Sequence, residues 1–331
     1  MQPIRFGVQI NNLDAPDLAD RIHRYEDYGF SSINAIDHLV YPEWSPLTTL
    51  GVISGLTESA AVGSPALSLL IHHPLELARA GAVLAAVSAG GCELGLGAGW
   101  LSDDWRTVGR ELEPAADRVQ RVEEAIRIIR SLWTQETTKI SGRFYTVDSA
   151  VPAMSLPLPA VPKIVLGHEY VDLELAGRYA DIVSLWPFTA QTLASADLQM
   201  RAWAAAGTIE YVGEIADIAR RSAIDAGRDP DALEFQMEIP VQVVEDDTEV
   251  LHRRLTSLSS SGTTPVSMIS SEMLDTSIFL AGRPGDVRDR IRRQRDETGL
   301  NYLVLQRNET TEDWGDLERL VENIVEPLTG Q

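Results

Sequence analysis

The amino-acid sequence predicts a single (β/α)8 TIM barrel over residues 1–331. Eight short segments have the character of strands, and a segment with helical periodicity follows nearly every one. No shift in composition divides the chain into two domains. The main alternative is a doubly wound sheet, which would place a glycine-rich phosphate loop after the first strand, where the chain has Gln9-Ile10-Asn11-Asn12. The barrel is therefore the predicted fold class.

The expected elements alternate along the chain in the order of a barrel. The expected strands cover residues 4–10, 32–37, 61–71, 163–167, 181–186, 233–244 and 302–306, together with a glycine-rich strand that begins at residue 92. The expected helices cover residues 16–28, 47–56, 74–88, 115–133, 171–179, 190–226, 248–259, 284–298 and 316–325. Two segments, at about 134–162 and 262–282, interrupt the alternation, and we interpret them as insertions on the C-terminal face.

Local sequence supports individual elements. Leu18, Ile22 and Tyr25 fall on one side of the first helix, as in a helix that packs on a core. Pro74 stands at the start of another helix, where its missing N–H has no partner to lose. Pro65, inside the third strand, predicts a bulge. Ser141-Gly142-Arg143 predicts a hairpin turn in the first insertion.

The glycine-rich stretch Cys92-Glu93-Leu94-Gly95-Leu96-Gly97-Ala98-Gly99-Trp100 has a glycine at every second position. Glycines spaced in this way clear the side chains from one face of a strand. A flat ligand can then lie against the backbone, or a neighbouring element can pack closely there, and the sequence leaves both interpretations open. The spacing differs from the G-x-G-x-x-G dinucleotide fingerprint.

Composition excludes several classes of protein. A net charge of −21 opposes sequence-independent binding to nucleic acid. No apolar run is long enough to span a membrane, and no signal peptide is visible, so we expect cytoplasmic residence. The single cysteine, Cys92, excludes an intrachain disulfide and a thiolate metal site, and the six histidines show no metal-ligand spacing, so no metal is expected. No G-x-S-x-G motif is present to supply a nucleophile.

In a barrel the carboxyl ends of the strands form the functional face. His38, beside Asp37 at the end of the second strand, is the candidate for proton transfer, since histidine titrates near neutrality; a capping or core histidine is the alternative. His72 precedes a helix, where histidines usually cap or pack. Trp44 and Trp186 come from loops of the same face, where aromatic side chains suit a planar ligand but are also common in packing.

These segments together resemble the bacterial luciferase-like monooxygenase superfamily, most closely its coenzyme F420-dependent branch. The resemblance is carried, in order, by Gly29-Phe30 with Ile36-Asp37-His38-Leu39, Pro46-Leu47-Thr48-Thr49-Leu50, His73-Pro74-Leu75-Glu76-Leu77-Ala78, Glu93 to Trp100, Arg118-Val119 with Leu132-Trp133-Thr134, Gly142-Arg143-Phe144-Tyr145 and Leu175 to Asp181. It covers about the first 190 residues well and the C-terminal third loosely.

The resemblance implies a TIM barrel that binds a flavin or deazaflavin at its C-terminal mouth, often as a homodimer. His38 matches the histidine that handles a proton beside the ring. We also expect Asp37, the residue before it, to be catalytic. Further residues are expected to contact the cofactor: Gln9 at the mouth, Ser64, Pro65 and Ala66 at a strand bulge behind the ring, and Gly97, Ala98, Gly99 and Trp100 along its border. We expect Trp44, His72 and Trp186 to line the substrate pocket.

The turn Gly167-His168-Glu169 departs from the family, which usually has a Gly-Gly-Ser-like turn that binds the cofactor phosphate there. A carboxylate repels a phosphate, and larger side chains close the cradle, whereas a histidine can donate a hydrogen bond to it. Because of this turn, a barrel that binds no cofactor is kept as an alternative.

Three hypotheses follow. The first is an F420-dependent oxidoreductase that moves a hydride between C5 of the deazaflavin and a C=C bond, an imine, or an alcohol or carbonyl, with His38 supplying or removing the proton. The second is a reduced-FMN-dependent monooxygenase. The third is a cofactor-free accessory or binding barrel. The expected partners are a small-molecule substrate, a second copy of the chain and a reductase that supplies reduced cofactor. The sequence specifies neither the substrate nor the direction of the reaction.

Overall fold

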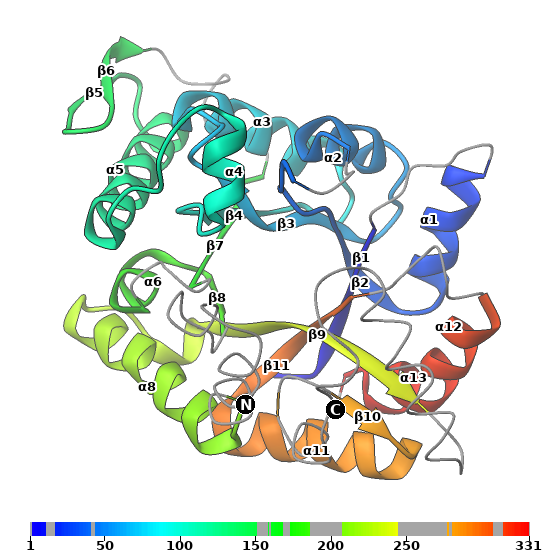
Figure 1. Ribbon diagram of the computed structural model, residues 1–331. Coiled ribbons are helices and arrows are strands. Elements are labelled where there is room, and N and C mark those ends of the chain that lie inside the picture. Colours follow the sequence, from blue (N-terminus) through cyan, green and yellow to red (C-terminus); the bar gives the residue numbers. More distant parts are fainter. Residues whose placement is uncertain are drawn as a thin grey trace.

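The computed structural model describes residues 2–10, 17–40, 44–150, 158, 160–167, 173–185, 207–243, 277, 280–306 and 314–330. Within them, eight parallel strands form a closed ring, because β9 pairs with both β11 and β8 (Figure 1). The ring consists of β1 (Arg5–Gln9), β2 (Phe30–Asn34), β3 (Ala61–Ser68), β4 (Cys92–Gly97), β7 (Lys163–Leu166), β8 (Ile182–Ser184), β9 (Glu234–Val243) and β11 (Leu300–Gln306). The predicted (β/α)8 barrel is confirmed.

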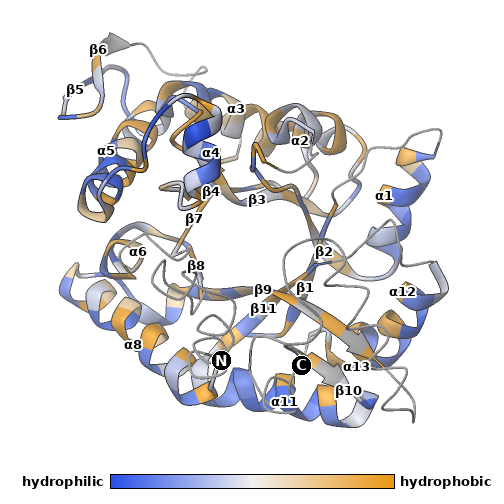
Figure 2. Ribbon diagram, viewed as in Figure 1, coloured by the Kyte–Doolittle hydropathy of each residue, from blue (hydrophilic) through white to orange (hydrophobic). Residues whose placement is uncertain are grey.

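Helices surround the ring (Figure 1). They are α1 (Leu18–Asp27), α2 (Pro46–Ser54), α3 (Pro74–Val87), α4 (Ser102–Thr107), α5 (Ala115–Thr134), α6 (Leu173–Tyr179), α8 (Ile209–Asp225), α11 (Pro284–Thr298), α12 (Trp314–Leu320) and α13 (Glu326–Leu328), with a π-helical turn, Val321–Val325, between the last two. Both hydropathy colours run along α5 and α8, as expected of helices with one buried side (Figure 2). None of the helices in the described ranges is long and apolar enough to cross a bilayer.

Several short elements were not predicted, and two of them lie next to strands of the ring. The short strand β10 (Leu280–Gly282) pairs with the far end of β9, beyond the ring, inside the second predicted insertion. The helix α4 follows the glycine-rich strand and fully buries Trp105. The predicted hairpin, in contrast, is confirmed, since β5 (Thr138–Ser141) and β6 (Thr146–Ala150) pair antiparallel. Glu124 of α5 holds its turn by accepting hydrogen bonds from the backbone amides of Arg143 (2.9 Å) and Phe144 (2.8 Å).

The predicted bulge in β3 is also confirmed, because the register of β3 against β4 shifts between Ser64 and Leu67. A Cβ atom at Gly95 would lie 1.9 Å from the carbonyl oxygen of Ser64 and 2.8 Å from the carbonyl carbon of Pro65. Any side chain at this position would therefore displace the bulge. Close packing of a neighbouring strand, rather than a ligand, explains this glycine.

Charged side chains fill the amino-terminal end of the barrel interior. Arg5 Nη2 lies 2.8 Å from Glu93 Oε1 and donates to Glu234 Oε2 at 2.7 Å. The guanidinium also lies over the ring of Tyr302, 3.4 Å from its centroid. Tyr302 donates a hydrogen bond to Glu93 Oε2 at 2.7 Å, and burial together with the Glu93 charge raises the pKa of its hydroxyl. These contacts join β1, β4, β9 and β11 through the centre of the ring.

This interior cluster predicts that Arg5→Ala lowers the free energy of unfolding much more than Lys139→Ala does. We expect Arg5→Ala to lower the free energy of unfolding by about 3–5 kcal/mol, because it leaves the buried carboxylates of Glu93 and Glu234 without their cation. Lys139→Ala removes the exposed Lys139–Asp148 pair and should change the free energy of unfolding by less than about 1 kcal/mol.

Urea unfolding measures both values. If Arg5→Ala does not fold, Tyr302→Phe tests the same cluster with an expected loss of about 1–3 kcal/mol. If the interior and surface variants lost equal amounts of stability, the stabilising role of the interior cluster would be contradicted.

Candidate active site

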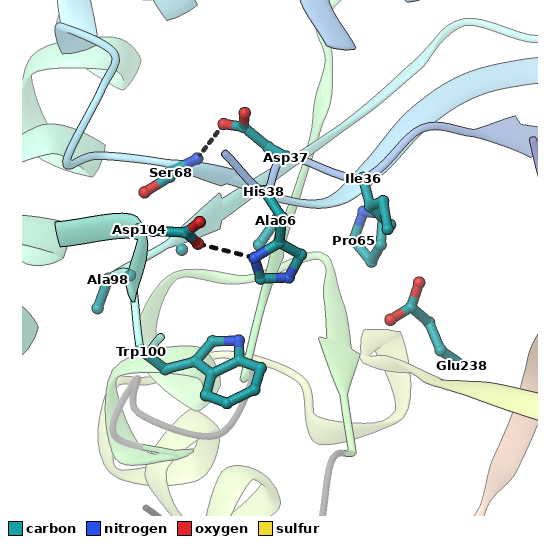
Figure 3. A pocket seen from close by; sticks show the side chains of 12 residues that line it. Ile36, Asp37, His38, Pro65, Ala66, Ser68, Ala98, Trp100, Asp104 and Glu238 are labelled. Atoms are coloured by element: carbon teal, nitrogen blue, oxygen red, sulfur yellow. Dashed lines mark hydrogen bonds and ion pairs between the residues drawn. The ribbon is translucent and has the colours of Figure 1, made fainter. Parts of the chain in front are cut away.

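A cleft lies at the mouth of the barrel and holds about 550 Å³ of empty space, part of it open to solvent. Its walls come from the carboxyl ends of β2, β3 and β4 and from β9 (Figure 3). The lining residues are Ile36, Asp37, His38, Pro65, Ala66, Ser68, Gly97, Ala98, Gly99, Trp100, Asp104 and Glu238. The closed ring brings together segments that lie up to about 200 positions apart in the chain.

His38 is held by Asp104 of α4 (Figure 3). Its Nδ1 lies 2.8 Å from Asp104 Oδ2, while Asp104 Oδ1 accepts hydrogen bonds from the backbone amides of Leu39 (2.8 Å) and Val40 (3.2 Å). The Trp100 ring meets the imidazole edge to face, with centroids 5.9 Å apart. Because a carboxylate acceptor fixes the proton on Nδ1, exchange of a proton with a ligand in the cleft falls to Nε2.

Asp37, which was also expected to be catalytic, contacts residues other than His38. Its Oδ2 accepts hydrogen bonds from the Ser68 amide at 2.8 Å and from His72 Nε2 at 3.1 Å. Figure 3 shows the Asp37 carboxylate directed toward Ser68 and away from the imidazole. Asp37 therefore joins the end of β2 to the end of β3, and Asp104 is the acid that pairs with His38.

His72 lies behind Asp37 rather than in the wall of the cleft, where it was expected. Its Nδ1 is 3.7 Å from Glu76 of α3. Burial by itself lowers the pKa of His72, but the hydrogen bond and charge of Asp37, with the charge of Glu76, outweigh this effect and raise it. His73, next in the chain, caps α3 by accepting a hydrogen bond from the Leu75 amide at 3.1 Å.

Other expected site residues lie outside the cleft wall. The Trp44 residue is 60% exposed, just before α2, because no element of the described chain covers it. Gln9 is buried at the end of β1 and does not border the cleft. Gly167 has a φ of +117°, and a Cβ there would lie 2.6 Å from the Ser184 carbonyl oxygen, so this position requires glycine. His168, Glu169 and Trp186 lie outside the described residues.

The cleft brings together most of the residues expected around the ring. Pro65, Ala66, Gly97, Ala98, Gly99 and Trp100 border it. Ser64 is buried one position before the cleft wall, at the bulge. A Cβ at Gly97 would lie 2.8 Å from the Ala66 side chain, so the wall is kept at the level of the backbone there. Gly99 has a φ of +73°, which favours glycine for a conformational reason.

Sequence reasoning missed two acids of the cleft, Asp104 and Glu238. Asp104 follows the glycine-rich strand on the functional face, where the helix that carries it went unrecognised. Glu238 belongs to the alternating segment Glu234-Phe235-Gln236-Met237-Glu238, and this period-two pattern was the available signal for an inward-facing polar residue.

A family model described as luciferase-like monooxygenase matches residues 4–325. The chain belongs to the luciferase-like monooxygenase family.

An F420-dependent glucose-6-phosphate dehydrogenase of Nakamurella multipartita is 30% identical over 190 residues, covering 54% of this chain and 55% of that protein. The chain thus spans about half the length of the curated relatives it matches.

Solved structures show the same fold. The coenzyme F420-dependent tetrahydromethanopterin reductase of Methanopyrus kandleri superposes with a TM-score of 0.73 at 16% identity, covering 99% of this chain and 100% of that one. The monooxygenase RslO1 of Streptomyces bottropensis superposes with a TM-score of 0.75 at 19% identity, covering 98% of both chains. Enzymes described as F420-dependent and as monooxygenases therefore share this fold, and the fold alone does not distinguish them.

The His72–Asp37 contact predicts a pH-dependent contribution to stability. Since the pKa of His72 is raised in the folded state, its stabilising contribution is complete below about pH 6.5 and is lost as pH rises through the folded value. We expect His72→Asn to destabilise the protein more at about pH 5.5 than at about pH 8.5. Urea unfolding at both values measures this difference. Asp37→Asn should reduce this difference, with Glu76 accounting for the remainder, and a His72→Asn effect independent of pH would contradict the prediction.

Proposed function

We propose that this chain is a coenzyme F420-dependent oxidoreductase that moves a hydride between C5 of the deazaflavin and a small organic substrate, with His38 handling the accompanying proton. The observation that carries the proposal is the His38–Asp104 pair at a cleft in the mouth of a luciferase-like barrel. The F420-dependent dehydrogenases among the curated relatives support the choice of cofactor.

The residues of the cleft fit a flat ring system. Pro65, Ala66 and Ala98 supply a largely apolar wall, and the missing side chain at Gly97 keeps part of that wall flat. Trp100 adds an aromatic surface beside the imidazole. These residues would hold the tricyclic ring beside His38.

The chemistry can be assigned to groups of this chain for an alcohol substrate. A bound deazaflavin supplies the hydride acceptor at C5. As the carbon–hydrogen bond breaks and the carbon–oxygen double bond forms, His38 Nε2 takes the hydroxyl proton; in the reverse direction it returns that proton to the oxygen. Asp104 keeps the Nδ1 proton in place and stabilises the imidazolium, while Trp100 limits the access of water to the pair.

The first test is a titration of the purified chain with F420 and, separately, with FMN, followed by fluorescence quenching. Tight F420 binding without FMN binding supports the proposal. FMN binding accompanied by O₂-dependent turnover would support the monooxygenase alternative. Binding of neither would support a cofactor-free accessory barrel.

Variants of the pair test the catalytic assignment. We expect His38→Ala to lower kcat by at least ~100-fold with F420 affinity largely kept, because proton transfer is lost while the ring wall remains. Asp104 acts through His38, so Asp104→Asn should lower kcat by at least ~10-fold with little change in KM, and Asp104→Glu should restore part of it. Wild-type turnover by His38→Ala, or equal losses with Asp104→Asn and Asp104→Glu, would contradict these roles.

We further propose that the chain forms a homodimer through α2 and α3, which pack side by side. Val52, Val83 and Val87 are each about half exposed on these helices, an arrangement that favours contact with another apolar surface. Light scattering should give the mass of a dimer, and Val83→Arg should shift it toward a monomer. Val108→Arg, at an exposed valine just after α4, is the matched control and should leave the mass unchanged.

A further inference from the structure

The segment that carries His38 leaves the sheet before it reaches the cleft. β2 pairs with β3 through Asn34, and a backbone hydrogen bond donated by the Ala35 amide (3.0 Å) extends the ladder by one residue. Beyond Ala35, two carboxylates make contacts that fix the segment (Figure 3). Asp37 belongs to the segment and reaches out of it, whereas Asp104 reaches in from α4. The position of His38 therefore depends on side-chain contacts outside the ladder.

The Asp37 carboxylate connects this segment to two other parts of the chain. Its Oδ2 accepts hydrogen bonds from the Ser68 amide, at the end of β3, and from Nε2 of His72, just before α3. Asp37 is 8% exposed, so the loss of one of these donors would leave a buried carboxylate short of a partner. Because a planar peptide bond joins Asp37 to His38, a shift of Asp37 moves the backbone that carries the imidazole.

His72 lies between two carboxylates of opposite sides. The charged groups that face it in the described chain are Asp37, whose Oδ2 is 3.1 Å from Nε2, and Glu76 of α3, whose Oε2 is 3.7 Å from Nδ1. Both ring nitrogens thus face acceptors, which favours the doubly protonated imidazolium. Glu76 is largely exposed, so solvent weakens its charge and Asp37 is the stronger partner. When His72 loses its proton, Nε2 can still donate to Asp37, but the attraction between opposite charges is lost.

We propose that His72 is a positioning residue for His38: by donating to Asp37 it holds the segment after β2 against the end of β3, and this contact weakens when His72 loses its proton. His72 is absent from the cleft wall, so it acts through Asp37 rather than on a ligand. The inference rests on the proposed function, in which His38 handles the proton of the reaction.

Hydrogen exchange of the full chain, read by mass spectrometry at the amides of Leu39 and Val40, tests the proposal. Both amides donate to Asp104, so their protection factors report how often the segment opens. His72→Phe keeps a ring and removes the donor, and we expect it to lower both protection factors at least ~10-fold. His72→Gln keeps a donor for Asp37, so its loss should stay below ~3-fold.

The same amides should show the effect of the His72 proton. Asp37 and Glu76 raise the pKa of His72 against the effect of burial, so its charge is complete below about pH 6.5 and is lost as pH rises through the folded value. In wild-type protein we expect higher protection factors at about pH 5.5 than at about pH 8.5, and a smaller difference in His72→Gln. Titration of His38 contributes to both proteins, so the comparison isolates His72.

The matched control is His23→Phe on α1, which should leave the protection factors of Leu39 and Val40 unchanged. The amides of α8 report global stability. The proposal is overturned if His72→Phe and His72→Gln lose equal protection, if the amides of α8 share the loss, or if wild type and His72→Gln show the same pH difference. This pH comparison decides the matter if His72→Phe does not fold. No measurement needs the cofactor, so failure to bind F420 would count against the proposed function alone.

Discussion

A closed ring of strands is stable only when its interior is filled, and in this protein charged groups fill one end of it. Arg5 lies between Glu93 and Glu234 and over the ring of Tyr302, so one guanidinium connects four strands. In a low-dielectric interior such contacts stabilise the fold only when the geometry is good. The cluster joins these strands at the amino-terminal end of the barrel, and the stagger of the strands decides which residues reach its mouth.

The same inward-facing rows of residues serve stability at one end and the candidate chemistry at the other. Along β9 the row runs from Glu234, which binds Arg5, to Glu238 at the cleft. Across the cleft, the chain beyond the end of β2 supplies His38. This division is usual for the two faces of a TIM barrel, where the carboxyl ends of the strands carry function. The inward-facing row of β9 is thus polar both at the Arg5 cluster and at the cleft.

The glycine-rich strand β4 shows that one motif can have several physical causes. Gly95 makes room for the carbonyl oxygen of Ser64 in the bulge of β3. Gly97 keeps the cleft wall at the backbone beside Ala66, and Gly99 allows a positive φ before α4. Of the two interpretations that the sequence left open, close packing accounts for Gly95, and Gly97 both packs against Ala66 and borders the cleft. The strand β4 thus contacts the bulge of β3 at Gly95 and forms part of the cleft wall at Gly97.

The sequence by itself determined the barrel and most helix positions, because hydrophobic periodicity can be recognised within each segment. It also determined the bulge, from Pro65, and the position of His38 at the mouth, from its place at the end of a strand. Only the tertiary structure decided that His38 pairs with Asp104 rather than with its neighbour Asp37. Asp104 lies 66 positions from His38 in the chain. The consecutive residues Asp37 and His38 point their side chains to different sides. Glu238 enters the cleft because closure of the ring places β9 across from β2, β3 and β4. Such contacts depend on register and closure, which local periodicity does not encode.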